Sequence, residues 1–178
     1  MDNLCFYLLD LIQNSIAAKS SFIELSIIEN HMIDISITDN GIGMTKSELD
    51  QALSPFYSSR TTRRVGLGLS MMKMLTEQTN GSFELTSVKN KGTKLSLSFN
   101  PSHIDFPDIG DIGELVYFIS IHQDVVNFSF IYQKGTEKYQ YNLKEIKEIL
   151  GEALQTFSVM KALIQTINKE IDTIRGIS

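Results

Sequence analysis

Apolar residues recur along the chain at two different periods, and these periods predict its elements. Leu4, Leu8, Leu11 and Ile16 follow the 3.6-residue spacing of a helix, which predicts a helix over residues 2–19. Residues 22–28 and 32–38 instead alternate between polar and apolar side chains, as β-strands do. We therefore expect a helix followed by a β-hairpin.

A second set of elements follows before residue 100. The sequence Thr45-Lys46-Ser47-Glu48 predicts a capping box at the start of a helix that runs to about residue 53. Another helix is expected from Leu67 to Asn80, and residues 82–88 and 93–99 alternate as a second hairpin. This order predicts an α+β fold, an α/β sandwich with one layer of helices on a mixed, mainly antiparallel sheet.

The composition changes at Pro101. Residues 101–110 contain proline and glycine and are predicted to be a connector between a first domain, 1–100, and a second part, 111–178. The second part is predicted to hold a helix near 111–121, strands near 125–133 and 136–142, and helices near 143–151 and 157–174. We expect it to be a small α+β module of unknown role.

Charge and cysteine content narrow the function classes. The 178 residues carry a net charge of −5, with a pI near 5.2, which argues against a general nucleic-acid-binding surface. No apolar stretch approaches the roughly 18 residues that a membrane span requires. The single Cys5 excludes an internal disulfide framework. We therefore expect a cytoplasmic protein that binds neither nucleic acid nor membrane.

Residues 55–69 carry the most distinctive chemistry. Arg60, Arg63 and Arg64 precede the sequence Gly66-Leu67-Gly68-Leu69. Glycines let backbone N–H groups turn toward a bound anion, and a following helix places its positive end there. This segment predicts a phosphate-binding lid; the alternative is an ordinary solvated loop. The glycines lack the third member of a dinucleotide-binding turn, so the segment is not a Rossmann turn. No Gly-Lys-Ser/Thr follows them, so it is not a Walker loop either.

Two further polar motifs precede this segment. Asp10 and Asn14 share one face of the first predicted helix, with the small Ala17 one turn later. A carboxylate and a carboxamide can hold a hard cation and a water, although a solvated polar stripe is the alternative. Asp39 leaves a strand before two spaced glycines and can accept a hydrogen bond from a ligand, although Asp-Asn-Gly is also a common turn.

Together these motifs resemble the GHKL, or Bergerat-fold, ATPases, which include gyrase-type topoisomerases, large heat-shock chaperones, sensor histidine kinases and MutL-type repair ATPases. Residues 10–18 resemble the N box, whose asparagine ligates Mg²⁺. Residues 39–43 resemble the G1 box, whose aspartate receives the adenine amino group. Residues 66–69 resemble the G2 box, Gly92-Thr93 the final Gly-Thr, and residues 55–60 the lid of histidine-kinase ATPase domains.

The resemblance implies ATP or ADP and Mg²⁺ as ligands, with Asn14 on the metal. It implies that the nucleotide is contacted by a larger set of positions from all of these motifs: Asn14, Ala17, Asp39, Gly41, Gly43, Met44, Ser58, Ser59, Arg60, Thr61, Thr62, Arg63, Gly66, Leu67, Gly68, Leu69 and Thr93.

Two departures from the family pattern concern activity. Asp10 stands where hydrolysing members carry a glutamate that activates water, and its side chain is one methylene shorter. We also expect no phosphoacceptor helix in this chain. The sequence therefore predicts an ATP–Mg-binding protein of the histidine-kinase-like type, with slow hydrolysis or phosphotransfer to a separate partner protein. The alternative is a nucleotide-gated interaction or regulatory module with little or no catalysis.

Overall fold

The computed structural model describes residues 3–53 and 68–177. Its first part contains two hairpins and three helices: α1 (Leu4–Ala17), β1 (Ile23–Glu29), β2 (Ile33–Asp39), α2 (Lys46–Ala52), α3 (Gly68–Gln78), β3 (Ser82–Val88) and β4 (Gly92–Phe99). The remainder contains a third hairpin among helices: α4 (Ile112–Ser120), β5 (Phe128–Lys134), β6 (Glu137–Asn142), α5 (Leu143–Leu150), a 3₁₀ helix (Gly151–Gln155) and α6 (Phe157–Arg175).

Side-chain caps explain where two of the helices begin. The side chain of Asn3 accepts a 3.0 Å hydrogen bond from the N–H of Phe6 at the start of α1. At the start of α2, Thr45 accepts from the N–H of Glu48 while the Glu48 carboxylate accepts from the N–H of Thr45. The predicted capping box is therefore confirmed.

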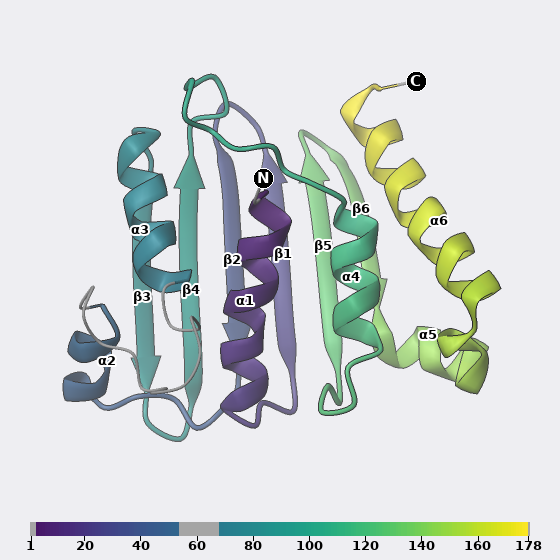
Figure 1. Cartoon of the computed structure of the whole chain (residues 1–178), viewed down its shortest axis with the longest axis horizontal. Coiled ribbons are helices and arrows are strands. Elements are labelled where there is room, and N and C mark those ends of the chain that lie inside the picture. The colour runs from purple at the N-terminus through teal and green to yellow at the C-terminus, as the bar shows by residue number, and fades with distance from the viewer. Residues whose placement is uncertain (1–2, 54–67, 178) are drawn as a thin grey trace.

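The strands form one six-stranded sheet in the order β3-β4-β2-β1-β5-β6. Every neighbouring pair is antiparallel except β1 and β5, which run parallel (Figure 1). The sheet is mixed and mainly antiparallel, as the sequence predicted.

The helices lie on one face of this sheet (Figure 1). Residues of β1 and β2 that face the helices, such as Leu25, Ile27 and Ile35, are buried. The residues between them, such as Ser26 and Ser36, lie on the other face and are only partly covered. This alternation is the pattern of a sheet that packs against a single helical layer, and it puts the core between α1, α3, α4 and the sheet.

The chain beyond residue 111 continues this sheet. Strand β5 pairs with β1 from Ile23↔Phe128 to Glu29↔Lys134, and α4 packs against both α1 and α6. The division into two domains at residues 101–110 stays a prediction. Local patterns could not indicate the β1–β5 pairing, because its two strands are far apart in the chain and neither sequence specifies the partner.

A polar cluster joins the end of α6 to the shared strands. Tyr132 donates a hydrogen bond to Glu29, Arg175 Nε lies 3.0 Å from Oε2 of Glu29, and Lys134 Nζ lies 3.5 Å from its Oε1. Burial alone would raise the pKa of Glu29, but the hydrogen bond from Tyr132 and the nearby Arg175 hold that pKa below its usual value. The cluster thus fixes α6 to both β1 and β5.

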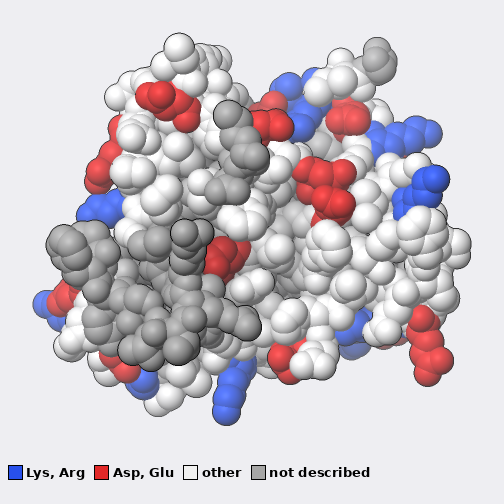
Figure 2. All heavy atoms as spheres, in the orientation of Figure 1, with Lys and Arg blue, Asp and Glu red and all other residues white. Residues whose placement is uncertain are grey.

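The surface bears charges of both signs. On the face that Figure 2 shows, the described Lys and Arg side chains are dispersed among Asp and Glu and form no continuous basic area. Within residues 3–53 and 68–177, no helix has the length and apolar character needed to cross a bilayer.

Candidate functional site

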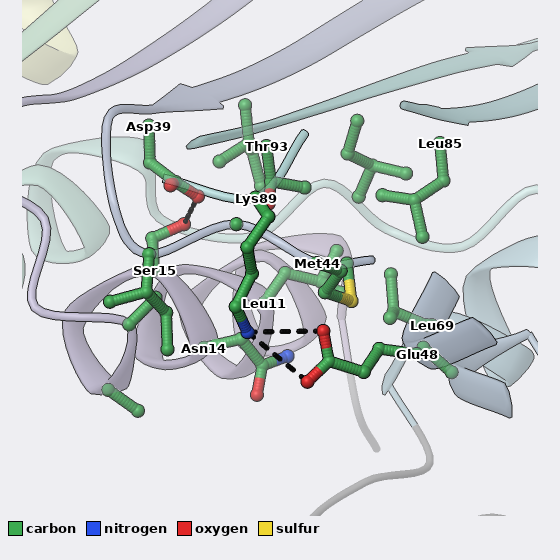
Figure 3. A pocket seen from close by; sticks show the side chains of 17 residues that line it. Leu11, Asn14, Ser15, Asp39, Met44, Glu48, Leu69, Leu85, Lys89 and Thr93 are labelled. Atoms are coloured by element: carbon green, nitrogen blue, oxygen red, sulfur yellow. Dashed lines mark hydrogen bonds and ion pairs between the residues drawn. The ribbon is translucent and has the colours of Figure 1, made fainter. Parts of the chain in front are cut away.

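A pocket of about 400 Å³ opens between α1, the loop that follows β2, α2 and the β3–β4 hairpin (Figure 3). Apolar side chains from the sheet and α1 make its walls, and a few polar groups project into it. Its lining consists of Leu11, Asn14, Ser15, Ala17, Ala18, Ile37, Asp39, Ile42, Gly43, Met44, Glu48, Ala52, Leu69, Leu85, Lys89, Thr93 and Leu95. A mainly apolar hollow with few polar groups is typical of small-molecule sites.

Asp39 is the most buried acid of this pocket. It ends β2, and only 7% of its surface is exposed. Its Oδ2 accepts a 2.7 Å hydrogen bond from the Ser15 hydroxyl, and its Oδ1 accepts a 2.9 Å bond from the N–H of Gly41. Each carboxylate oxygen has a further lone pair. Asp39 is therefore held in one orientation by the protein while it keeps the capacity to accept from a ligand.

Thr93 stands beside Asp39, because the two residues are paired in the β2–β4 register. The Thr93 hydroxyl lies 2.8 Å from that of Ser87. Ser87 also accepts from the N–H of Met44 at 2.8 Å and donates to the carbonyl of Gly92 at 3.0 Å. A hydroxyl has a single hydrogen to donate, so Thr93 is the donor toward Ser87. The Thr93 oxygen consequently offers acceptor lone pairs next to the Asp39 carboxylate.

The loop between Asp39 and Met44 is fixed on both sides. The N–H of Ile42 donates to the carbonyl of Ala18 at 3.0 Å, and the N–H of Asn90 donates to the carbonyl of Ile42 at 2.7 Å. Gly43 has φ +57°, and a Cβ at this position would overlap the carbonyl oxygen of Val88. Only glycine satisfies both constraints. The loop is therefore wedged between α1 and the β3–β4 hairpin.

Asn14 and Ala17 line the pocket from α1, but Asp10 on the same helix is not among the lining residues. The Asp10 carboxylate lies against Gly68, the first residue of α3, where it occupies the space that a Cβ would need. A carboxylate at a helix N-terminus is favoured by the helix dipole. Asp10 thus contacts the start of α3, while Leu69, one residue on, lines the pocket.

The structure gathers seven of the residues predicted from sequence around this pocket, namely Asn14, Ala17, Asp39, Gly43, Met44, Leu69 and Thr93. Gly41 and Gly68 lie behind the lining, where Gly41 donates to Asp39 and Gly68 contacts Asp10. The predicted lid positions Ser58, Ser59, Arg60, Thr61, Thr62, Arg63, Gly66 and Leu67 lie outside the described residues.

Three polar residues of the pocket were not predicted as site residues. Ser15 occupies a position in the apolar period of α1. A serine at an apolar position is the sequence signal that could have indicated a buried polar partner. Lys89 and Glu48 form an ion pair, with Nζ 3.2 Å from both carboxylate oxygens. A hydrogen bond from the N–H of Thr45, and then Lys89, lower the pKa of Glu48. Nothing in the local sequence indicates that Lys89 reaches Glu48.

Metal-ligating side chains are sparse in the part of the chain that the structure describes. It contains no group of three or more His, Cys, Asp or Glu side chains that could hold a metal ion. Mg²⁺ needs no such group when it arrives with a nucleotide, because it is then held by one or two protein ligands together with phosphates and waters. The Asn14 amide oxygen in the pocket fits that ligand set.

Comparisons with known proteins agree with this arrangement. Residues 2–103 match the family described as histidine kinase-, DNA gyrase B-, and HSP90-like ATPase. The chain is 36% identical over 93 residues to sporulation kinase B of Bacillus subtilis (50% of the chain, 22% of that protein). It is 31% identical over 107 residues to the sensor-like histidine kinase SenX3 of Mycolicibacterium smegmatis (56% and 27%). The chain thus spans less than a third of either relative.

A solved structure extends the likeness in fold beyond residue 103. The N-terminal domain of a DNA repair protein has a TM-score of 0.55 and 16% sequence identity, and the alignment covers 86% of this chain and 58% of the other. At that identity the likeness concerns the fold alone. The family match covers more than half of the chain and includes every element around the pocket. The chain therefore belongs to the family of histidine kinase-, DNA gyrase B- and HSP90-like ATPases.

Proposed function

We propose that the chain binds ATP with Mg²⁺ in the pocket that contains Asp39, and that it either hydrolyses the nucleotide slowly or transfers its terminal phosphoryl group to a separate protein. The observation that carries the proposal is the buried Asp39 carboxylate, which is oriented by Ser15 and Gly41 between apolar walls. A buried acceptor in a mainly apolar hollow suits a planar base with an exocyclic amino group.

Asp39 would select adenine over guanine. The adenine amino group donates a hydrogen bond to the carboxylate, whereas guanine presents a carbonyl at that position. An unpaired buried acceptor costs about 1–3 kcal/mol, and more when it is charged. The expected preference for ATP over GTP is at least about tenfold. Thr93, paired with Asp39 on the neighbouring strand, adds an acceptor at the same end of the pocket.

The other end of the pocket suits the phosphates. Asn14 projects from α1, and Leu69 brings the first turn of α3 to the pocket. A helix N-terminus favours negative charge, as phosphates carry. Bound Mg²⁺ would neutralise part of the phosphate charge, with the Asn14 amide oxygen as its ligand from this chain. We propose that Ser58, Ser59, Arg60, Thr61, Thr62 and Arg63 contact the phosphates, on the strength of their resemblance to the family's lid.

The placement of Asp10 supports the second candidate function. If its carboxylate acts on the start of α3 rather than on water, the chain is a nucleotide-gated interaction module with little turnover. The contact between Asp10 and Gly68 favours this reading, because it puts the carboxylate outside the pocket lining. Under either function the nucleotide site is the same, and a protein partner is required for transfer or for gating. The single cysteine keeps the cytoplasm as the proposed location.

Incubation with ATP labelled in the γ-phosphate, with Mg²⁺ and with or without cell extract, tests these functions. Label retained on the chain as nucleotide shows binding, released phosphate shows hydrolysis, and label on another protein shows transfer. The proposal predicts retention, together with slow release or transfer. Retention without either supports the gated module, and absence of retention at millimolar ATP contradicts both.

A further inference from the structure

The β3–β4 hairpin supplies a positive charge to the pocket. Lys89 is the sole Lys, Arg or His among the described residues that line it, whereas Asp39 and Glu48 are both acids. In Figure 3 the Lys89 side chain extends from the hairpin across the hollow, and its amine ends on the side where Asn14 and Glu48 lie. A cation at this position attracts a ligand that carries several negative charges.

Lys89 forms an ion pair with Glu48 at 3.2 Å. Both side chains are substantially exposed: the exposed fraction is 43% for the Lys89 side chain and 48% for the Glu48 side chain. An exposed ion pair of this kind changes a folding or binding equilibrium constant by about fivefold or less. A polyphosphate carries several negative charges where Glu48 carries one, so at a similar distance it attracts the ammonium more strongly. The ion pair is therefore weak enough to be exchanged for a nucleotide.

Glu48 keeps its own place when Lys89 leaves. Its carboxylate also accepts a 2.7 Å hydrogen bond from the N–H of Thr45 as part of the capping box of α2. Among the described residues, the Lys89 amine bonds only to the two Glu48 oxygens, so it has no second partner of this kind. Lys89 is thus the mobile member of the pair, and the lysine stem is long enough to swing toward the pocket interior.

We propose that Lys89 is a nucleotide-binding residue that exchanges its Glu48 partner for the phosphates of the bound nucleotide. This inference rests on the proposed ATP site and adds to it a phosphate contact from the hairpin that also carries Thr93. Glu48 acts as a competitor: it pairs with Lys89 in the absence of nucleotide and opposes the incoming anion. Replacing Glu48 should therefore strengthen nucleotide binding rather than weaken it.

Calorimetric titrations with ATP–Mg and with adenosine test this exchange. Lys89→Met should lower ATP affinity about tenfold, as expected for one charge-assisted hydrogen bond at a partly exposed site, and leave adenosine affinity unchanged. Lys89→Arg should restore ATP affinity. Lys91→Met, an exposed lysine of the same turn that does not line the pocket, is the matched control and should bind as the wild type does.

The sign of the Glu48→Gln effect separates exchange from a purely structural ion pair. Glutamine keeps the capping box, so Glu48→Gln should raise ATP affinity about threefold in the wild type and by less in the Lys89→Met background. If Lys89 only holds α2 in place, both variants should weaken ATP and adenosine binding alike, which overturns the inference. Wild-type protein that binds no ATP contradicts the proposed function itself; wild-type binding that Lys89→Met leaves unchanged contradicts this inference alone.

Discussion

The hydroxyl of Ser15 donates a 2.7 Å hydrogen bond to Oδ2 of Asp39, and so links α1 to the end of β2. Ser15 directly follows Asn14, so this bond fixes the distance between the residue proposed for the metal and the residue proposed for the base. The Gly41 N–H occupies the other oxygen of Asp39 at 2.9 Å. The Ser15–Asp39 hydrogen bond therefore joins the two ends of the pocket.

Ser15→Ala should weaken both the fold and the site. Alanine removes the donor and leaves a buried carboxylate oxygen with one partner fewer, which costs about 1–3 kcal/mol of unfolding free energy. ATP affinity should fall by about tenfold, because Asp39 is no longer oriented. Urea denaturation and calorimetric titration measure the two effects.

Ser20→Ala is the matched control for Ser15→Ala. Ser20 is equally buried, but its hydroxyl donates to the carbonyl of Ser15 and not to Asp39. It should lose stability with little change in ATP affinity. An unchanged ATP affinity in Ser15→Ala would mean that the hydrogen bond does not position Asp39 for a ligand.

The glycine at position 43 should be irreplaceable. Gly43→Ala places a Cβ on a residue with φ +57° and against the carbonyl of Val88, so the loop must move. We expect the free energy of unfolding to fall by about 3 kcal/mol or more. ATP binding should be lost as well, since Ile42 and Met44 both line the pocket.

Gly135→Ala measures how much of that loss comes from the positive φ angle alone. Gly135 has φ +58°, almost the same as Gly43, but its Cβ would meet nothing within 4 Å. Gly135→Ala should lower the free energy of unfolding by about 1 kcal/mol and leave ATP affinity unchanged. Equal losses in the two variants, measured by thermal unfolding, would show that the close approach to Val88 does not matter.

Local sequence predicted the elements around the pocket well and the contacts across it poorly. The capping box at Thr45 and the turn at Gly43 involve neighbouring residues, so spacing alone indicated them. The Lys89–Glu48 pair joins a hairpin turn to a helix 41 residues away, and no periodicity encodes it. The same holds for β5 beside β1, where the sequence indicated strands but not their partners.

The cluster around Glu29 predicts a pH dependence. Its pKa is lowered from the ordinary value of 4.5, so its contribution to stability is fully present above that value and is lost as pH falls through the lower, folded-state pKa. Glu29→Gln should cost about 2 kcal/mol at pH 7, because Arg175 and Lys134 lose their charged partner.

The same variant should also flatten the acid limb of the stability curve. Denaturant unfolding followed from pH 7 downward should show a smaller loss in Glu29→Gln than in the wild type once pH drops below 4.5. Parallel curves over that range would refute the assignment of the lowered pKa to this cluster.

Asp10→Asn distinguishes catalysis from gating. If the carboxylate activates water, turnover should fall by about 10²-fold or more, with ATP affinity nearly unchanged. If it holds the start of α3 through Gly68, ATP affinity should fall as well, because Leu69 in that turn lines the pocket. A phosphate-release assay and a titration on the same sample decide between them; no change in either would remove Asp10 from both roles.

The central claim is that Asp39 recognises adenine, and titration of Asp39→Asn with ATP–Mg and GTP–Mg tests it most directly. Asp34→Asn is the matched control, because Asp34 lies on the same strand but is exposed on the opposite face of the sheet. We predict that the wild type and Asp34→Asn bind ATP at least about tenfold more tightly than GTP. Asp39→Asn should lose at least tenfold in ATP affinity while remaining folded. Equal affinity of the wild type for ATP and GTP, or unimpaired ATP binding by Asp39→Asn, would contradict the claim.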